Sequence, residues 1–447
     1  MKIQQLGVIL SIALPMMLSN ITVPLLGLVD TAVIGHLEHS YYLAGVALGS
    51  MVVTLVYWLC GFLRMATTGL CAQAYGSGSR ERMLQILVNA LFCVSLISLL
   101  LLVLRAPLID FALSLAGGSL EVQQQARGYI SIRILSGPAA LANLALLGWM
   151  LGMQSAKAPM WQLIVTNSLN IAFDLLLVVG LDMKVEGAAW ASVMADYCGL
   201  AMALILSRKL WLAQWQQLPS FKECRAVFNW LGLRQLLALN RDIFVRSMAL
   251  QACFAFMTFK GSHLGDHVVA ANAVLLNFLL FVSFALDGLA YAVEALAGKA
   301  KGEGDEVSFR QLVHSCMLLA AYCAAAFSLG FVVAGDQLIA LLTDLPEVRS
   351  TAQQYLSWLQ LLPLLAVWCF VLDGVFIAVA EGRAMRNSML IASLGVFFPL
   401  WWLAQDWGNH ALWLAMSGFM LSRGIGLGLL YRQAIVHRRW FNQTAPG

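Results

Sequence analysis

The sequence predicts an all-α membrane protein in which twelve transmembrane helices form two pseudo-symmetric lobes of six helices. Three observations support this fold class. Of the 447 residues, 61% are hydrophobic and only 11% are charged, with a mean hydropathy of +0.80, which is typical of polytopic membrane proteins and not of soluble domains. Long apolar stretches alternate with short polar breaks, and the second half of the chain repeats motifs of the first.

The apolar stretches divide the chain into twelve predicted spans. A membrane helix needs roughly 17 to 25 mainly apolar residues, and each of these stretches is long enough. The spans run approximately over 7–35, 42–70, 83–104, 122–150, 160–181, 186–206, 236–259, 268–295, 309–333, 351–379, 388–404 and 410–431.

The distribution of charge predicts that both termini are cytoplasmic. An even number of spans places both ends of the chain on one side of the membrane. If the N-terminus is inside, the cytoplasmic segments and the span ends beside them carry seventeen Lys and Arg, and the opposite side carries five. The positive-inside rule favours this orientation. The first apolar run is too long for a signal peptide and contains Pro15 and Asn20, so we expect it to be retained as a helix.

The first span combines two prolines, Pro15 and Pro24, with one carboxylate, Asp30. Each proline removes a backbone hydrogen bond, so this helix is expected to bend. A carboxylate at membrane depth costs roughly 2.5–3.5 kcal/mol, so it persists mainly where protein or water surrounds it. The sequence therefore predicts a moving helix with a titratable group. The alternatives are a static kink and an Asp30 that is solvated at the far interface.

The longest polar break, 207–235, lies almost at mid-chain and predicts the domain organisation. Trp211 and Trp215 share a helical face beside Arg208 and Lys209, which is typical of an amphipathic helix on the inner membrane surface. We therefore expect an N-terminal lobe over 1–206, a cytoplasmic amphipathic linker over 207–235, and a C-terminal lobe with a short tail over 236–447.

An internal repeat relates the two lobes. Ala-Gln-Ala-Tyr-Gly-Ser-Gly at 72–78 matches Gly-Lys-Ala-Lys-Gly-Glu-Gly at 298–304, and further Gly, Ala and His positions match at nearly the same shift. Six spans in each copy make the two copies parallel, related by an axis along the membrane normal. Transporters built in this way bind substrate in a central cleft between the copies.

The fifth span carries a polar stripe. Asn167, Asn170 and Asp174 are three and four residues apart, which places them on one face of an otherwise apolar helix. Such a stripe is expected to face protein or water and not lipid. It is either a seam of hydrogen bonds between helices or part of an ion site, and the carboxylate of Asp174 favours the ion site.

Neighbouring spans supply further polar groups. Tyr129 and Arg133 lie in the fourth span, and Ser192 and Asp196 lie in the sixth. Tyr129 is a candidate site residue or an interfacial aromatic. Asp196 is a candidate of the same rank, or else it pairs with Arg133 as charge compensation.

The second lobe offers fewer candidates. Arg241, Asp242 and Arg246 open the seventh span, where their charges are expected to neutralise one another. Asp373 precedes a glycine near a predicted cytoplasmic end. We therefore interpret Asp373 as solvated, with a role in an ion site as the alternative.

No motif for catalysis is present. The chain lacks the His-Glu-x-x-His, Gly-x-Ser-x-Gly and Walker patterns, so neither an enzyme nor an ATPase is predicted. The nine cysteines are scattered without a Cys-x-x-Cys pair, which argues against disulfides and metal sites. No cofactor is expected. Transport by such a chain must be driven by an ion gradient or by a partner.

Several motifs together carry a family resemblance. They are Leu-Pro early in the first span, Val-Asp-Thr-Ala-Val-Ile-Gly-His at 29–36, and Ala-Gln-Ala-Tyr-Gly at 72–76. With twelve spans in two lobes, the chain resembles the multidrug and toxic compound extrusion (MATE) family over nearly its whole length. Leu-Ala-Leu-Asn-Arg-Asp-Ile at 237–243 and Ala-Leu-Asp-Gly-Leu-Ala-Tyr-Ala-Val-Glu-Ala at 285–295 resemble the DinF branch.

The resemblance assigns roles to individual positions. Pro15 matches the kink proline, and Asp30 matches the carboxylate of the first helix. The polar cluster of the N-terminal lobe is matched by Tyr129, Asn170, Asp174 and Ser192, where Ser192 replaces an expected threonine. The NorM branch has an acidic residue within the seventh helix. Since this chain has only Gln251 there, the resemblance implies no NorM-like cation site in the C-terminal lobe, and Asp373 is interpreted as its remnant.

The sequence and the resemblance together predict a multidrug efflux antiporter of the bacterial inner membrane. Its partners are amphipathic, mostly cationic compounds, membrane lipids and H⁺ acting through the N-terminal carboxylate site, and no nucleic acid is expected. A monomer is expected. One alternative is Na⁺ coupling, with Na⁺ held by Asp30, Asp174 and Asn170. A second alternative is a flippase for a lipid-linked precursor.

Overall fold

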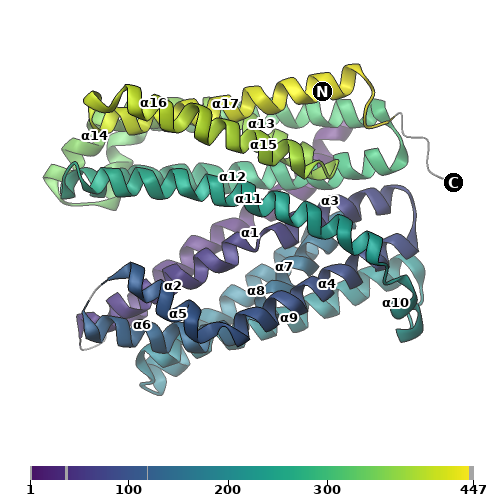
Figure 1. Ribbon diagram of the computed structural model, residues 1–447, viewed down its shortest axis with the longest axis horizontal. Coiled ribbons are helices and arrows are strands. Elements are labelled where there is room, and N and C mark those ends of the chain that lie inside the picture. The colour runs from purple at the N-terminus through teal and green to yellow at the C-terminus, as the bar shows by residue number, and fades with distance from the viewer. Residues whose placement is uncertain (1–2, 36–38, 118, 442–447) are drawn as a thin grey trace. The chain divides into compact units, whose positions relative to one another are not determined.

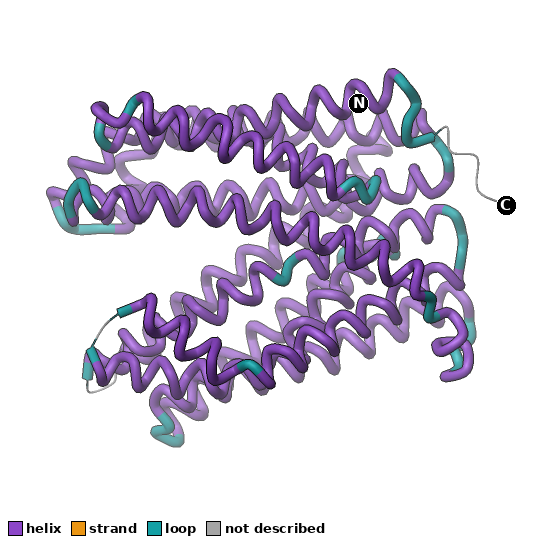
Figure 2. The backbone as a smooth tube through the Cα atoms, viewed as in Figure 1, coloured by secondary structure: helices purple, strands orange, loops and turns teal. Residues whose placement is uncertain are grey.

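The computed structural model describes residues 3–35, 39–117 and 119–441, and the side chains at 3–4, 23–32, 35 and 40 lie outside this description. The described backbone consists of helices joined by short connections (Figure 2). Within it, eleven helical segments are long and apolar enough to cross a membrane. The predicted all-α membrane architecture is therefore confirmed.

The chain divides into two compact units, and each is described by itself. The first unit comprises Leu18–Ala238, and the second comprises Met1–Met17 together with Leu239–Gly447. Two helices, α1 (Ile3–Gly35) and α11 (Trp230–Ser262), are each divided between the units. They are the first helices of the two predicted repeats. Pro15 lies two residues before the division of α1.

The remaining helices of the first unit appear in Figure 1 from α2 to α10. Their bounds are α2 (Ser40–Leu59), α3 (Phe62–Gly76), α4 (Arg80–Val103), α5 (Arg105–Ala116), α6 (Leu120–Arg133), α7 (Gly137–Gly152), α8 (Lys157–Asp174), α9 (Lys184–Trp215) and α10 (Phe221–Val227). A short 3₁₀ turn, Ile134–Ser136, joins α6 to α7. The twelve-residue helix α5 lies where the sequence predicted a loop.

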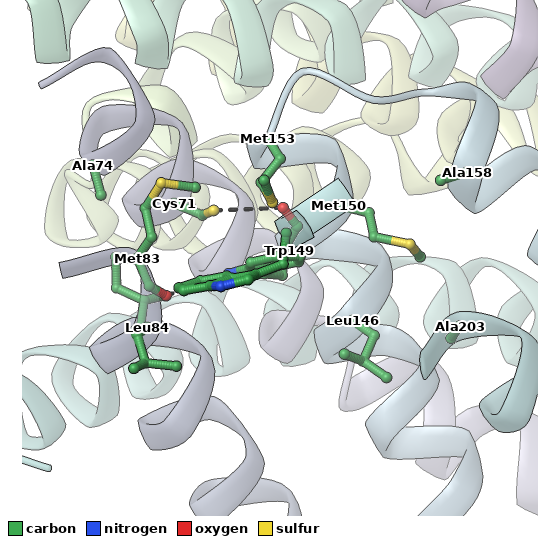
Figure 3. Close-up of a cluster of buried hydrophobic side chains, with 12 residues drawn as sticks. Cys71, Ala74, Met83, Leu84, Leu146, Trp149, Met150, Met153, Ala158 and Ala203 are labelled. Atoms are coloured by element: carbon green, nitrogen blue, oxygen red, sulfur yellow. Dashed lines mark hydrogen bonds between the residues drawn. The ribbon is translucent and has the colours of Figure 1, made fainter. Parts of the chain in front are cut away.

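The core of the first unit is built around Trp149 on α7 (Figure 3). Its indole ring is fully buried, and its Nε1 donates a hydrogen bond to the carbonyl oxygen of Met83 on α4 at 3.3 Å. The thiol of Cys71 on α3 donates to the carbonyl oxygen of Trp149 at 3.4 Å. One residue thereby ties α3, α4 and α7 together.

Trp211 corrects one expectation about the mid-chain segment. Helix α9 continues through the membrane span to Trp215, and the rings of Trp211 and Trp215 lie 4.3 Å apart on one face, as predicted. That face packs on protein and not on the membrane surface, because Trp211 is buried and stacks on Trp149 at 5.9 Å. An indole that reaches an apolar core gains more burial than one at an interface.

The second unit is built around α14 (Pro346–Ala378), which packs against α12 (Asp266–Glu303), α13 (Glu306–Leu342) and α17 (Asn409–Val436). Gly374 permits the close approach of α12 and α14, because a Cβ at this position would lie 2.8 Å from the carbonyl oxygen of Ala290.

The predicted span 388–404 is helical but divided. It comprises α15 (Gly382–Ala392), a π-helical segment Ser393–Phe397 and α16 (Phe398–Leu403). It is absent from the eleven apolar segments, and Arg383 and Arg386 in its first turns lower its hydropathy. A 3₁₀ turn, Gln405–Trp407, connects α16 to α17.

Candidate functional site

The polar stripe of the fifth predicted span forms the centre of the candidate site in the first unit. Nδ2 of Asn170 on α8 donates a hydrogen bond to Oγ of Ser192 on α9 at 3.0 Å. Both side chains are 5% exposed, and Asp174, one turn beyond Asn170, is 2% exposed. Leu175, the next residue, is 51% exposed. The expectation that the stripe faces protein and not lipid is therefore correct.

Asn170 also carries a buried acceptor. Its Oδ1 has no hydrogen-bond partner among the described residues. An amide oxygen that is removed from water without a partner costs free energy, so such atoms are frequently found where an ion, a water molecule or a ligand binds. Asn170 and Asp174 thus present an amide oxygen and a carboxylate on one buried helix face.

A π-helical segment follows directly after Asp174. Helix α8 ends at this residue, and Leu175–Gly180 adopts π-helical backbone. Such segments break the regular hydrogen-bond ladder and often occur at functional sites. The sequence did not predict this feature, because Leu-Leu-Leu-Val-Val-Gly contains no proline and reads as a plain apolar helix.

Helix α1 contacts the site helices at two levels. Nδ2 of Asn167 on α8 donates to Oγ1 of Thr22 on α1 at 2.6 Å. Further along α1, the buried side chain of Ile34 belongs to an apolar cluster with Tyr129 on α6, Val178 in the π-helical segment and Val185 on α9. The backbone of Pro24 and Asp30 lies on α1 between these levels, but their side chains lie outside the described residues.

Tyr129 is buried within this apolar cluster. The side chain is 5% exposed and packs against α2, where a Cβ at Gly49 would lie 2.7 Å from Cδ1 of Tyr129. Tyr129 is therefore a buried residue and not an interfacial aromatic.

Asp196 pairs with Arg133, as the charge-compensation interpretation predicted. Nη1 of Arg133 lies 2.7 Å from Oδ2 of Asp196, and it also donates to Oγ of Ser136. The guanidinium group lies 5.7 Å from the ring of Tyr57, whose hydroxyl donates to the carbonyl oxygen of Arg133 at 3.1 Å. This pair joins α6 to α9, one turn from Ser192.

Asp373 corrects the interpretation of the second unit. It is 7% exposed, and its Oδ2 accepts hydrogen bonds from Nη2 of Arg246 on α11 and, at 2.7 Å, from Nη2 of Arg423 on α17. Asp373 is therefore paired inside the protein and not solvated at a cytoplasmic end. A buried charge is strongly unfavourable without partners, and the two arginines supply them.

The charges at the start of α11 are distributed differently from the prediction. Asp242 interacts with Arg241 at 3.0 Å and with Arg386 on α15 at 2.8 Å, whereas Arg246 interacts with Asp373. No local pattern predicts this exchange of partners, because Arg386 and Asp373 lie more than a hundred residues along the chain from Asp242 and Arg246.

Comparison with known proteins agrees with this architecture. The MatE family model matches residues 15–176 and 243–403 of this chain. The chain is 46% identical to DNA damage-inducible protein F of Escherichia coli over 97% of this chain and 93% of that protein. It is 23% identical to a probable multidrug resistance protein NorM of Thermotoga maritima over 76% of this chain and 73% of that protein.

Solved structures share the fold. A crystal structure of MATE in the straight conformation matches with a TM-score of 0.86 at 18% identity and covers 97% of this chain and 96% of that one. A crystal structure of MATE in the bent conformation matches with a TM-score of 0.83 at 18% identity, over 98% of this chain and 97% of that one.

Proposed function

Because this chain belongs to the MatE family and is a multidrug and toxic compound efflux transporter, we propose that it exchanges amphipathic, mostly cationic compounds for H⁺ at a carboxylate site in the first unit. The observation that carries this proposal is the buried pair of acceptors on α8, Oδ1 of Asn170 and the carboxylate of Asp174, on helices that also contact α1.

Asp30 is proposed as the third member of the site. Residues four apart share a helical face, and Ile34 on α1 packs with Tyr129, Val178 and Val185. We propose that Asp30 acts together with Tyr129, Asp174 and Ser192, which is the set of site residues that the family resemblance implies.

Protonation is proposed to release the substrate. We propose that Asp30 takes up a proton that enters from the outer side of the membrane. A neutral Asp30 loses its charge-assisted contacts with a cationic substrate. The energy balance between conformers of α1 then shifts, because protonation affects one conformer more than the other.

Helix α1 is proposed as the moving part. Pro15 and Pro24 each remove a backbone hydrogen bond, and this lowers the cost of bending. The division of α1 between the two units, two residues after Pro15, supports a hinge there. Crystal structures of MATE in the straight and in the bent conformation support the idea that this fold accommodates two states.

The proposed setting is the bacterial inner membrane with both termini in the cytoplasm, which the bias of Lys and Arg supports. We further propose that residues 1–206 and 236–447 form two six-helix lobes, with residues 207–235 connecting them on the cytoplasmic side. The protein is proposed to work as a monomer.

Transport by purified protein in proteoliposomes tests the proposal. A fluorescent cation should move against its gradient when a pH gradient is imposed in Na⁺-free buffer. If transport requires a Na⁺ gradient instead, the coupling ion is Na⁺ and not H⁺, and Asp30, Asp174 and Asn170 are the residues proposed to hold it. If neither gradient moves the cation, the proposal of cation exchange is wrong.

A further inference from the structure

A cavity of about 30 Å³ opens in the first unit where α3, α4 and the first turns of α11 meet. Its polar lining comes from Arg82, Gln85 and Asn89 on α4 and from Gln235 on α11, and Gly232 forms part of its wall. All these residues belong to the unit Leu18–Ala238. The cavity is separate from the polar stripe on α8, so the proposed transport site does not explain it.

Asn89 gives the cavity a chemical preference. Its side chain is 2% exposed, and its Oδ1 has no hydrogen-bond partner among the described residues. Buried acceptors are nearly always satisfied in folded proteins. An acceptor that lines a cavity therefore favours an occupant that donates a hydrogen bond.

Arg82 adds a positive charge at the edge of the same cavity. Its neighbour Arg80 lies 3.4 Å from Glu223, whereas Arg82 forms no ion pair among the described residues. Arg82 is exposed, so its guanidinium group is accessible to a molecule outside the protein. An arginine of this kind is suited to a phosphate, which it binds through two parallel hydrogen bonds.

The surface beside the cavity exposes large apolar side chains. Trp230 and Leu231, directly before Gly232, are 69% and 67% exposed. Phe228 packs edge-on against Phe92 of α4 at 5.4 Å. In a membrane protein, tryptophan and exposed apolar side chains at the start of a spanning helix indicate the interface between headgroups and acyl chains. The cavity therefore lies within reach of lipid headgroups.

We propose that this cavity binds the headgroup of phosphatidylethanolamine, with Arg82 on the phosphate and Oδ1 of Asn89 accepting a hydrogen bond from the ammonium group. The size of the cavity supports this assignment, because about 30 Å³ exceeds the roughly 10–15 Å³ that a group of the size of water needs, and an ammonium group is of similar size. The trimethylammonium group of phosphatidylcholine is larger and has no N–H to donate. The site therefore distinguishes these two zwitterionic lipids.

Native mass spectrometry of the detergent-purified full chain tests the proposal with matched dioleoyl lipids. Wild-type protein should bind phosphatidylethanolamine about 10-fold more tightly than phosphatidylcholine, because only phosphatidylethanolamine can donate a hydrogen bond from a charged group to Asn89. Stepwise N-methylation of the headgroup should lower the affinity with each methyl group. Inorganic phosphate should not displace the lipid, and displacement would assign the site to a free anion and overturn the proposal.

Variants separate the two contacts. Asn89→Leu keeps the volume but removes the acceptor, so the two lipids should bind equally. Arg82→Gln should lower the affinity for both lipids about fivefold, because one positive charge near the membrane surface is lost. Arg208→Gln removes an exposed arginine of α9 away from the cavity and is the matched control, with unchanged binding.

Gly232→Ala provides a test that removes no polar group. The new Cβ would lie 3.1 Å from Nε2 of Gln85 and 3.2 Å from Nδ2 of Asn89, so these amides must shift, which changes the lining of the cavity. We expect phosphatidylethanolamine to lose its advantage over phosphatidylcholine in this variant. Equal binding of both lipids to wild-type protein, or an advantage that survives both Asn89→Leu and Gly232→Ala, would overturn the proposal.

Discussion

Asn170 donates its Nδ2 hydrogen bond to Oγ of Ser192 across the contact between α8 and α9, at 3.0 Å and with both side chains buried. This bond fixes the orientation of the Asn170 amide. Its Oδ1 atom is then left as an acceptor that has no hydrogen-bond partner among the described residues. It also links the carboxylate-bearing helix to the helix of the Asp196–Arg133 pair. A single hydroxyl thereby orients the acceptor on which the proposed site depends.

Asn170 and Asp174 should act as one unit in transport. Asn170→Ala and Asp174→Ala are each expected to abolish most gradient-driven export, and the double variant should lose little more. Members of one network typically show interaction energies of about 0.5–3 kcal/mol. Initial export rates in proteoliposomes provide the measurement. If the free-energy cost of the double variant equals the sum of the costs of the two single variants, the two residues belong to separate sites.

Ser192 should contribute through its hydroxyl and not through its size. Ser192→Ala leaves the buried Asn170 amide without its acceptor, which is expected to cost about 1–3 kcal/mol of stability as well as export. Ser192→Thr retains the hydroxyl and is the matched control with near-normal transport. Thermal unfolding and export rates check both. Wild-type export by Ser192→Ala would show that orientation of Asn170 is unimportant.

Asp30→Asn should fold and insert but fail to export, since it mimics a permanently protonated carboxylate. Asp110→Asn is the control, because Asp110 on α5 has a side chain that is 61% exposed and pairs with Arg127. A fluorescent cation driven by a pH gradient measures the difference between the two variants. Normal export by Asp30→Asn would remove this residue from the coupling mechanism.

Helix α1 should respond to pH as a moving element. Spin labels at Leu18 on α1 and Tyr322 on α13, which are 60% and 69% exposed, should change their separation between neutral and acidic pH in a cysteine-free background. The change should vanish in Asp30→Asn and shrink in Pro15→Ala, which restores a backbone donor. An unchanged response in Asp30→Asn would identify another sensor, with Asp174 as the first candidate.

Asp373 should support stability and not cation binding. Asp373→Ala leaves the guanidinium groups of Arg246 and Arg423 buried without their shared carboxylate, and loss of one partner in such a cluster costs about 3–5 kcal/mol. Thermal unfolding should show this loss in Na⁺-free buffer and in Na⁺ alike. An Asp373→Ala variant of normal stability that lost Na⁺-dependent export would instead identify a cation site.

The residues themselves determined the class of the molecule and the identity of most site candidates. Hydropathy predicts membrane helices because apolar side chains must face lipid wherever the chain spans it. The same constraint made Asn167, Asn170 and Asp174 conspicuous, since three polar groups on one helix face had to be turned towards protein. The Arg133–Asp196 pair was also predictable, because opposite charges within membrane-spanning segments usually pair with each other.

Tertiary structure alone decided which distant groups meet. Asp373 reads as a solvated carboxylate along the chain, and only the packing of α11 and α17 against α14 brings Arg246 and Arg423 to it. Trp211 reads as an interfacial residue, but stacks on Trp149 within the core. The Asn89 cavity requires α3, α4 and α11 to converge. Local patterns specify which groups need a partner, whereas the choice of partner depends on contacts between residues far apart in the chain, which no single window of sequence contains.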